Sequence, residues 1–250
     1  MPATPAWPPK SLPRLFVGGP LGPGISIDLD SQQANYLGNV MRLKTRDQAL
    51  LFDGASGEWL AIVSDAGKKR MTLTIERKTR EQESVPDCWL AFAPVKRSQT
   101  DWLVEKATEL GIARLIPVIT RRTIVERVKL ERLEAITIEA AEQCNRTSVP
   151  HIAEPLSLET LLKGRDPERR RLYFADEGGG EPVAKAFKPG AAMILTGPEG
   201  GFTDEERASI RAAPNSIPIS LGPRILRAET AALAAVTTYM AVAGDWLIAP

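Results

Sequence analysis

The segment whose residues most clearly suggest a ligand-binding role is the glycine-rich run Gly197–Phe202. It follows an apolar run, Ala192–Thr196, that predicts a buried strand, and it precedes Thr203–Glu206, whose Thr and Glu at the right spacing predict a helix-capping box. Glycines at a strand-to-helix turn leave backbone N–H and C=O groups open to a ligand at the carboxyl end of the strand. A tight, well-capped loop without a ligand explains the same residues, so spacing alone leaves both interpretations open.

The composition of this loop restricts the ligand class. The loop lacks the Gly-x-Gly-x-x-Gly fingerprint of dinucleotide sites and the Gly-Lys-Ser/Thr of phosphate loops. Glu199 would repel a phosphate. A cofactor that carries a sulfonium, a ribose and an adenine, without phosphate, meets no such conflict.

A second turn precedes the last predicted helix. Gly222-Pro223 is followed by Arg224, Arg227 and Glu229. Arginines near a helix N-terminus oppose the helix dipole, so their placement there indicates an anionic partner such as RNA phosphate. The alternative is simple capping, with Glu229 complementing the dipole and the arginines in water.

The surrounding elements divide the chain. Residues 1–13 are proline-rich and expected to be a flexible leader, residues 14–80 show short strands with period-2 alternation, and residues 81–88 form a linker. Residues 89–250 alternate strands and helices, which is typical of an α/β domain. The predicted strands are 15–17, 25–29, 49–52, 59–63, 71–76, 89–93, 115–119, 172–175, 192–196 and 217–221, and the predicted helices are 31–40, 100–110, 130–143 and 228–242.

Composition excludes several classes of protein. The chain has 250 residues, a formal charge of +1, two cysteines and one histidine. No apolar run approaches the roughly 20 residues that span a bilayer, and a metal cluster or disulfide framework needs more ligands than are present. We therefore expect a cytoplasmic protein without metal or membrane contact, whose RNA contacts come from local basic patches such as residues 42–46, 68–70 and 121–127.

Five segments together resemble the family of small-subunit ribosomal RNA methyltransferase E, the 16S rRNA uridine-N3 methyltransferases of the SPOUT superfamily. The resemblance spans nearly the whole chain. Its segments are Leu195–Phe202, Leu221–Ala231, Lys106–Gly111, Glu139–Gln143 with Arg146, and Asn39–Leu43.

The resemblance implies the fold and the partners. It implies an N-terminal PUA-like β-barrel that docks RNA, a C-terminal SPOUT-type α/β domain with a deep trefoil knot, and a homodimer. Sequence reasoning without the family would predict an ordinary doubly wound sheet, since threaded chains are rare. The implied cofactor is S-adenosylmethionine, and the implied partner is 16S rRNA or the small ribosomal subunit.

The same resemblance supports roles for individual residues. We expect Arg224 and Arg227 to stabilise charge that develops on the uracil, and Glu229 to be a candidate proton acceptor. We expect Arg42, Lys96, Gln143 and Arg146 to contact RNA. The cofactor is expected to contact, largely through backbone groups, Leu195, Thr196, Gly197, Pro198, Glu199, Gly200, Leu221, Gly222, Ile225 and Leu226.

Departures from the family pattern lie outside the two cofactor loops. Tyr36 replaces a frequent histidine, Arg46 replaces a glycine, Asn145 replaces a small residue, and Asp176–Gly180 is a loop particular to this chain. Three alternatives stay open: a methyltransferase that acts on a ribose hydroxyl or another base, a non-catalytic ribosome-assembly factor, and an α/β enzyme with a phosphate-bearing cofactor. The intact glycines and the missing phosphate loop weigh against the last two.

Overall fold

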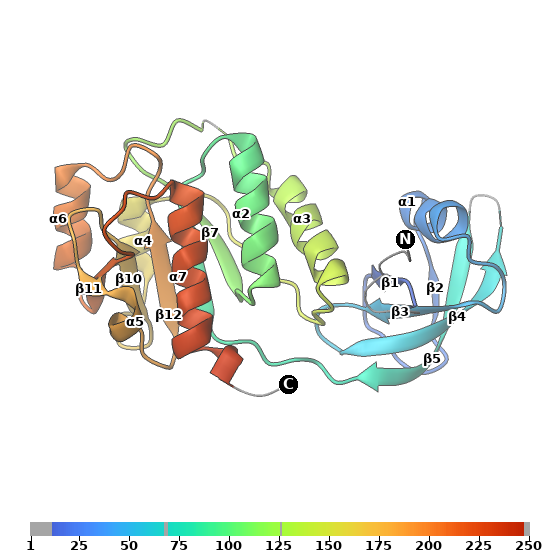
Figure 1. The fold of residues 1–250 in the computed structure, drawn as a ribbon. Helices are drawn as coiled ribbons and strands as arrows, with labels where there is room; N and C mark the ends of the chain where they lie inside the picture. Colours follow the sequence, from blue (N-terminus) through green and yellow to red (C-terminus); the bar gives the residue numbers. More distant parts are fainter. Residues whose placement is uncertain (1–11, 68–69, 126, 248–250) are drawn as a thin grey trace, which may run out of the picture. The chain divides into compact units, whose positions relative to one another are not determined.

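The computed structural model describes residues 12–67, 70–125 and 127–247 (Figure 1). The predicted leader therefore lies almost entirely outside the described residues. The chain forms two compact units, residues 1–84 with 141–148, and residues 85–140 with 149–250. The sequence-based division did not anticipate that residues 141–148 belong with the first unit.

The first unit is built on a five-stranded sheet. Its order is β1 (Arg14–Phe16), β3 (Gln48–Phe52), β4 (Glu58–Ala66), β5 (Met71–Arg80) and β2 (Ser26–Asp28), with β1 parallel to β3 and the other pairs antiparallel. Met71, Leu73 and Ile75 alternate with more exposed residues, as a strand with one buried face requires. The predicted helix at 31–40 is α1 (Ser31–Asn35) followed by a π-helical turn, η1 (Tyr36–Val40).

Arg14 holds residues 141–148 within this unit. Its guanidinium donates to the carbonyl of Ala141 at 2.8 Å, to that of Arg146 at 2.5 Å and to the carboxylate of Glu58 at 2.5 Å. Carbonyls at the end of a helix lack intrahelical donors, so Arg14 caps the end of α3 (Leu130–Gln143). Burial lowers the pKa of Arg14, and the hydrogen bond to Glu58 opposes that shift.

Two departures from the family pattern have a backbone explanation. Arg46 has φ of +80° and Asn145 has φ of +64°. This left-handed region favours glycine and, among other residues, asparagine. The family resemblance implied a glycine or a small residue at these positions, and the left-handed backbone gives a physical reason for that expectation.

The second unit is built on a parallel sheet in the order β11-β13-β10-β12-β6-β7-β8, with β9 paired to β7. Because β10 lies between β12 and β13, the loops that follow these three strands meet at one edge of the sheet. The strands are β6 (Cys88–Phe92), β7 (Arg114–Ile119), β8 (His151–Ile152), β9 (Leu156–Ser157), β10 (Arg171–Ala175), β11 (Glu181–Pro182), β12 (Ala192–Thr196) and β13 (Ser216–Ser220).

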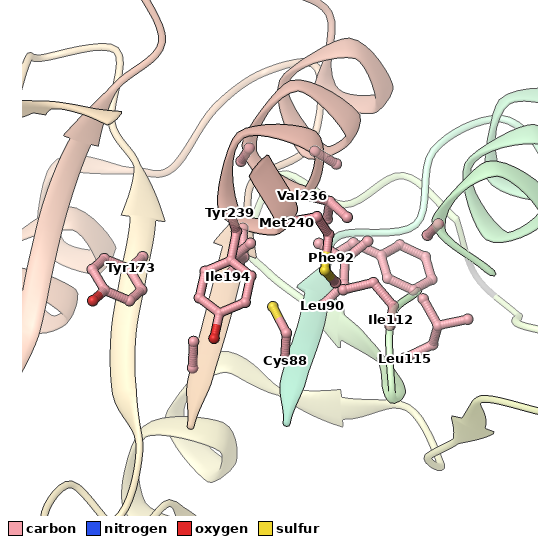
Figure 2. Close-up of a cluster of buried hydrophobic side chains, with 14 of the residues drawn as sticks. Cys88, Leu90, Phe92, Ile112, Leu115, Tyr173, Ile194, Val236, Tyr239 and Met240 are labelled. Atoms are coloured by element: carbon pink, nitrogen blue, oxygen red, sulfur yellow. The ribbon is translucent and has the colours of Figure 1, made fainter. Parts of the chain in front are cut away.

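Helices cover both faces of this sheet. One face packs against α2 (Arg97–Glu109), α5 (Val183–Ala186) and α7 (Ala228–Val242), and the other against α4 (Leu158–Gly164) and α6 (Asp204–Ala212). Figure 2 shows the first core, in which Val236, Tyr239 and Met240 of α7 pack over β6 and β12. Alternation within the strands separates the two cores, since Ile194 belongs to the first and Leu195 to the second.

The longer predicted elements are found where the sequence placed them. The helices at 130–143 and 228–242 and the strand at 192–196 have the predicted bounds. Gly111, with φ of +95°, follows the end of α2 as expected. The elements β8, β9, β11, α4 and α5 were not predicted, because two to seven residues are too few to show a period.

Candidate active site

A cavity of about 590 Å³ lies at the carboxyl ends of β10, β12 and β13. Its walls are the loops that follow these strands, residues 175–179, 196–202 and 219–228, together with Arg207 and Ala231. This edge is where open α/β sheets bind ligands. The two glycine-rich turns identified in the sequence thus face a common space.

Most of the predicted cofactor residues line this cavity. They are Thr196, Gly197, Pro198, Glu199, Leu221, Gly222, Ile225 and Leu226, joined by Arg224 and Arg227. Leu195 and Gly200 do not line it. Leu195 is fully buried in the core beneath, and an added Cβ at Gly200 would lie 3.4 Å from Cδ of Arg122.

The first loop is held rigidly from outside the cavity. The predicted capping box is present: the Thr203 hydroxyl accepts from the Glu206 amide at 3.2 Å, and the Glu206 carboxylate accepts from the Thr203 amide at 2.9 Å. The second oxygen of Glu206 accepts from the Arg121 amide at 2.8 Å. Arg122 donates to the Gly200 carbonyl at 2.6 Å, so this arginine supports the loop in addition to being part of a basic patch.

The third loop that lines the cavity, residues 175–179, was not predicted as part of the site from the sequence. Asp176, at the end of β10, has a side chain that is only 1% exposed and lines the cavity. It accepts from the Gly178 amide at 2.8 Å and forms ion pairs with Arg207 at 3.1 Å and Arg211 at 2.5 Å. Both arginines belong to α6, one turn apart, so they fasten this loop to the helix that follows the first loop.

The position of this third loop depends on strand order. An added Cβ at Gly180 would lie 2.3 Å from the carbonyl oxygen of Pro218, so the loop lies directly on β13. A run of three glycines after a predicted strand was a signal for a ligand loop. The sequence alone could not assign these glycines to the site, because it does not show that β10 lies between β12 and β13.

Arg227 and Glu229 lie at the start of α7. Arg227 is the N-cap residue of that helix, and it lines both the main cavity and a second hollow. Glu229 is 8% exposed and lines the second hollow rather than the main cavity. Of the three predicted catalytic residues, Arg224 lines the main cavity, Glu229 lines the second hollow, and Arg227 lines both.

The predicted RNA contacts differ in exposure. Arg42, Lys96 and Gln143 are exposed. Arg146 is buried, donates to the Ser148 hydroxyl at 2.9 Å and lies 3.5 Å from the carboxylate of Glu83. These contacts favour a structural role for Arg146.

The chemistry of the cavity fits a phosphate-free adenosine cofactor. A volume near 590 Å³ is within the usual range of roughly 300–1,000 Å³ for small-molecule sites. Asp176 and Glu177 are paired with arginines of α6, whereas Glu199 is exposed on the cavity wall and disfavours phosphate. Within the described ranges, no group of three or more histidine, cysteine or acidic residues is arranged to hold a metal, and no helix is long and apolar enough to cross a bilayer.

Comparison with known proteins identifies the class. The profile of an RNA methyltransferase domain matches residues 81–240, and that of an RNA methyltransferase PUA domain matches residues 29–76. The fold is thus that of a two-part RNA methyltransferase, with a parallel α/β domain and a PUA-like domain.

The relatives narrow the class to one family. The chain is 33% identical over 229 residues to ribosomal RNA small subunit methyltransferase E of Rickettsia conorii, covering 89% of this chain and 93% of that one. It is 34% identical over 224 residues to the protein of the same name from Synechocystis, covering 87% and 73%. The chain belongs to the ribosomal RNA small subunit methyltransferase E family.

Solved structures agree with this assignment. The family member from Neisseria gonorrhoeae, bound to S-adenosylmethionine, matches with a TM-score of 0.85 and 30% identity over 94% of this chain and 100% of that one. A Legionella pneumophila structure with the same bound cofactor matches with a TM-score of 0.85 and 28% identity over 94% and 99%.

Proposed function

We propose that this protein transfers the methyl group of S-adenosylmethionine to N3 of a uridine in 16S ribosomal RNA. The observation that carries the proposal is the convergence of three backbone-rich loops on one cavity. The family membership supports it, as does the cofactor named in the Neisseria structure.

The cofactor would lie among the three loops. S-adenosylmethionine, when bound, supplies an electrophilic methyl group on a sulfonium. Gly197, Glu199, Leu221, Gly222 and Leu226 would hold it, mainly through backbone donors and acceptors. Gly222 suits this role because its φ of +104° needs glycine and its Cα faces open space.

Methylation at N3 requires removal of a proton. The imide nitrogen of uridine is protonated at neutral pH, so a base must take the proton before or during attack. Glu229 is our proposed acceptor. Arg227, with Arg224 beside it, would stabilise the charge that develops on O2 or O4, because guanidinium stays cationic and donates to two acceptors.

RNA docking would involve the PUA-like domain and the exposed predicted contacts Arg42, Lys96 and Gln143. We further propose that the chain acts as a cytoplasmic homodimer and that its C-terminal domain contains a trefoil knot. Ala231 and Ala234 of α7 are partly exposed, and such small side chains would allow a partner subunit to approach closely. The knot is proposed from the family resemblance.

The test combines binding and product analysis. Wild-type protein should bind S-adenosylmethionine in calorimetry and transfer a tritiated methyl group to small-subunit RNA. Mass spectrometry of digested RNA should show a base-methylated uridine, and a ribose-methylated nucleoside would contradict the N3 assignment.

Arg227 provides a variant that separates chemistry from cofactor binding. Arg227→Ala should leave the Kd for S-adenosylmethionine nearly unchanged and abolish transfer, a loss of roughly 100-fold or more in kcat. A fully active variant would remove Arg227 from the mechanism.

A further inference from the structure

A second hollow adjoins the cofactor cavity. Its lining comes from the first turns of two helices that pack against each other, α2 and α7 (Figure 1). We propose that this hollow receives the uracil ring of the target nucleotide and that the Trp102 indole is its stacking platform. The proposal rests on the proposed function and adds the binding site of the methyl acceptor. The lining residues are Ser98, Gln99, Trp102, Arg227, Glu229 and Thr230.

The position of the hollow suits an acceptor site. Arg227 lines both depressions, so the two meet at a single side chain. In-line methyl transfer requires the nucleophile within about 3–3.5 Å of the methyl carbon. An acceptor held in a hollow that adjoins the cofactor cavity is placed for that approach.

Trp102 is a large aromatic side chain on the exposed side of α2. Its neighbours Leu103 and Val104 are 2% and 0% exposed in the core, whereas Trp102 is 45% exposed at the hollow. Proteins that bind unpaired bases stack them on exposed aromatic rings. The other lining residues are polar or charged, which favours a nucleobase over an apolar protein surface.

Glu229 gives the hollow a preference among bases. It is 8% exposed, and within the described ranges its carboxylate has no hydrogen bond or ion pair. The Watson–Crick edge of uracil presents an acceptor, the N3–H donor and a second acceptor. A carboxylate matches the donor, while the Arg227 guanidinium and the Gln99 amide match the acceptors. Cytosine carries a lone pair at N3, which the carboxylate would repel.

The transfer step follows from this arrangement. The N3 proton passes to a Glu229 carboxylate oxygen, N3 forms a bond to the methyl carbon, and the carbon–sulfur bond breaks with its electron pair left on sulfur. The cationic sulfonium becomes a neutral thioether, and the carboxylate becomes a neutral acid. The N-cap residues Lys96 and Arg227 form no side-chain capping bond, so the positive ends of both helices favour negative charge on uracil oxygens.

The experiment compares three tryptophan variants of the full-length protein. Trp102→Ala removes the platform, Trp102→Phe keeps an aromatic ring, and Trp246→Ala is the matched control, because Trp246 is 52% exposed and lies outside the hollow. Each variant is measured for S-adenosylmethionine affinity by calorimetry, for methyl-transfer kinetics on small ribosomal subunits, and for mass by light scattering.

The expected result has a defined pattern. Trp102→Ala should lower kcat/KM by roughly 10- to 100-fold, the scale of losing one stacked base, with cofactor Kd and mass unchanged. Trp102→Phe should recover most of the activity, and Trp246→Ala should match the wild type. Substituting cytidine for the target uridine should abolish transfer.

Three outcomes would overturn the proposal. Wild-type kinetics for Trp102→Ala would show that no base stacks there, and equal loss in Trp102→Ala and Trp102→Phe would exclude stacking. A change of mass in Trp102→Ala would assign the hollow to contact with a second copy of the chain. A wild-type protein that neither binds the cofactor nor transfers methyl would refute the proposed function itself. This result differs from the three outcomes above, which concern only the Trp102 variants.

Discussion

At the scale of single residues, Asp176 is the side chain that joins the third loop to the rest of the cavity. Its carboxylate accepts from an amide of its own loop and pairs with Arg207 and Arg211 of α6. Buried carboxylates are kept only where several donors compensate for lost water. Asp176 therefore positions a cavity wall, and its effect on catalysis would pass through the cofactor.

Asp176→Asn should weaken S-adenosylmethionine binding. The neutral amide cannot pair with both guanidinium groups, so the loop loses its anchor. We expect an increase in Kd of about tenfold, equal to about 1.4 kcal/mol, measured by calorimetry. Glu177→Gln is the control, since Glu177 is 54% exposed and pairs with one arginine, Arg207, among the described residues, and it should have a smaller effect. Equal affinities for Asp176→Asn and wild type would contradict this role.

The two cysteines should differ in reactivity. Cys88 is fully buried, and burial raises the pKa of its thiol far above the ordinary value, whereas Cys144 is partly exposed. Because the thiolate is the reactive form, a thiol reagent should modify at most one cysteine of the folded protein, even as the pH rises to about 9, past the usual thiol pKa of about 8.5. Titration in denaturant should release both thiols. Rapid modification of Cys88 in the native protein would contradict its place in the core.

At the scale of elements, the capping box at the start of α6 links secondary structure to the site. Thr203 and Glu206 exchange hydrogen bonds, and Glu206 also accepts from the Arg121 amide in the loop after β7. The start of α6 thus fixes both the glycine-rich loop at 197–202 and a neighbouring loop. The sequence signature and the structure agree here because a capping box needs only local residues.

Thr203→Ala should destabilise the protein modestly. The variant leaves the Glu206 amide without its acceptor, which costs about 1 kcal/mol of unfolding free energy, measured by urea denaturation. Thr203→Ser keeps the hydroxyl and should lie close to the wild type. If the alanine and serine variants were equally stable, the hydroxyl would have no capping role.

At the scale of the whole molecule, cofactor binding should act on one unit. The cavity is lined only by residues of the second unit. At a cofactor concentration of 100 times Kd, the native state gains about 2.7 kcal/mol. Hydrogen exchange should therefore slow in residues 175–179, 196–202 and 219–228, with no matching change in the strands of the first unit.

ATP serves as the control ligand for this experiment. It carries the same adenosine with three phosphates, and Glu199 on the cavity wall disfavours them. ATP at the same concentration should leave the exchange rates unchanged. Protection by ATP equal to that by S-adenosylmethionine would contradict a phosphate-free site.

The sequence by itself determined the features that depend on neighbouring residues. The capping box at Thr203, the helix end at Gly111, the long helix 228–242 and the two glycine turns all follow from local sterics and hydrogen bonding. The family resemblance rests on these same turns. It supplied the reaction and the cofactor, which local physics alone leaves open between several ligands.

Only the tertiary structure decided which of these features meet. The order of β13, β10 and β12 brought Asp176 to the cavity. The packing of α2 against α7 placed Glu229 in a separate hollow with Trp102. Strand order depends on contacts between residues far apart in the chain, and no short pattern encodes them. Arg146 illustrates the same limit, because its burial against Ser148 and Glu83 arises from packing that a basic residue in a sequence does not reveal.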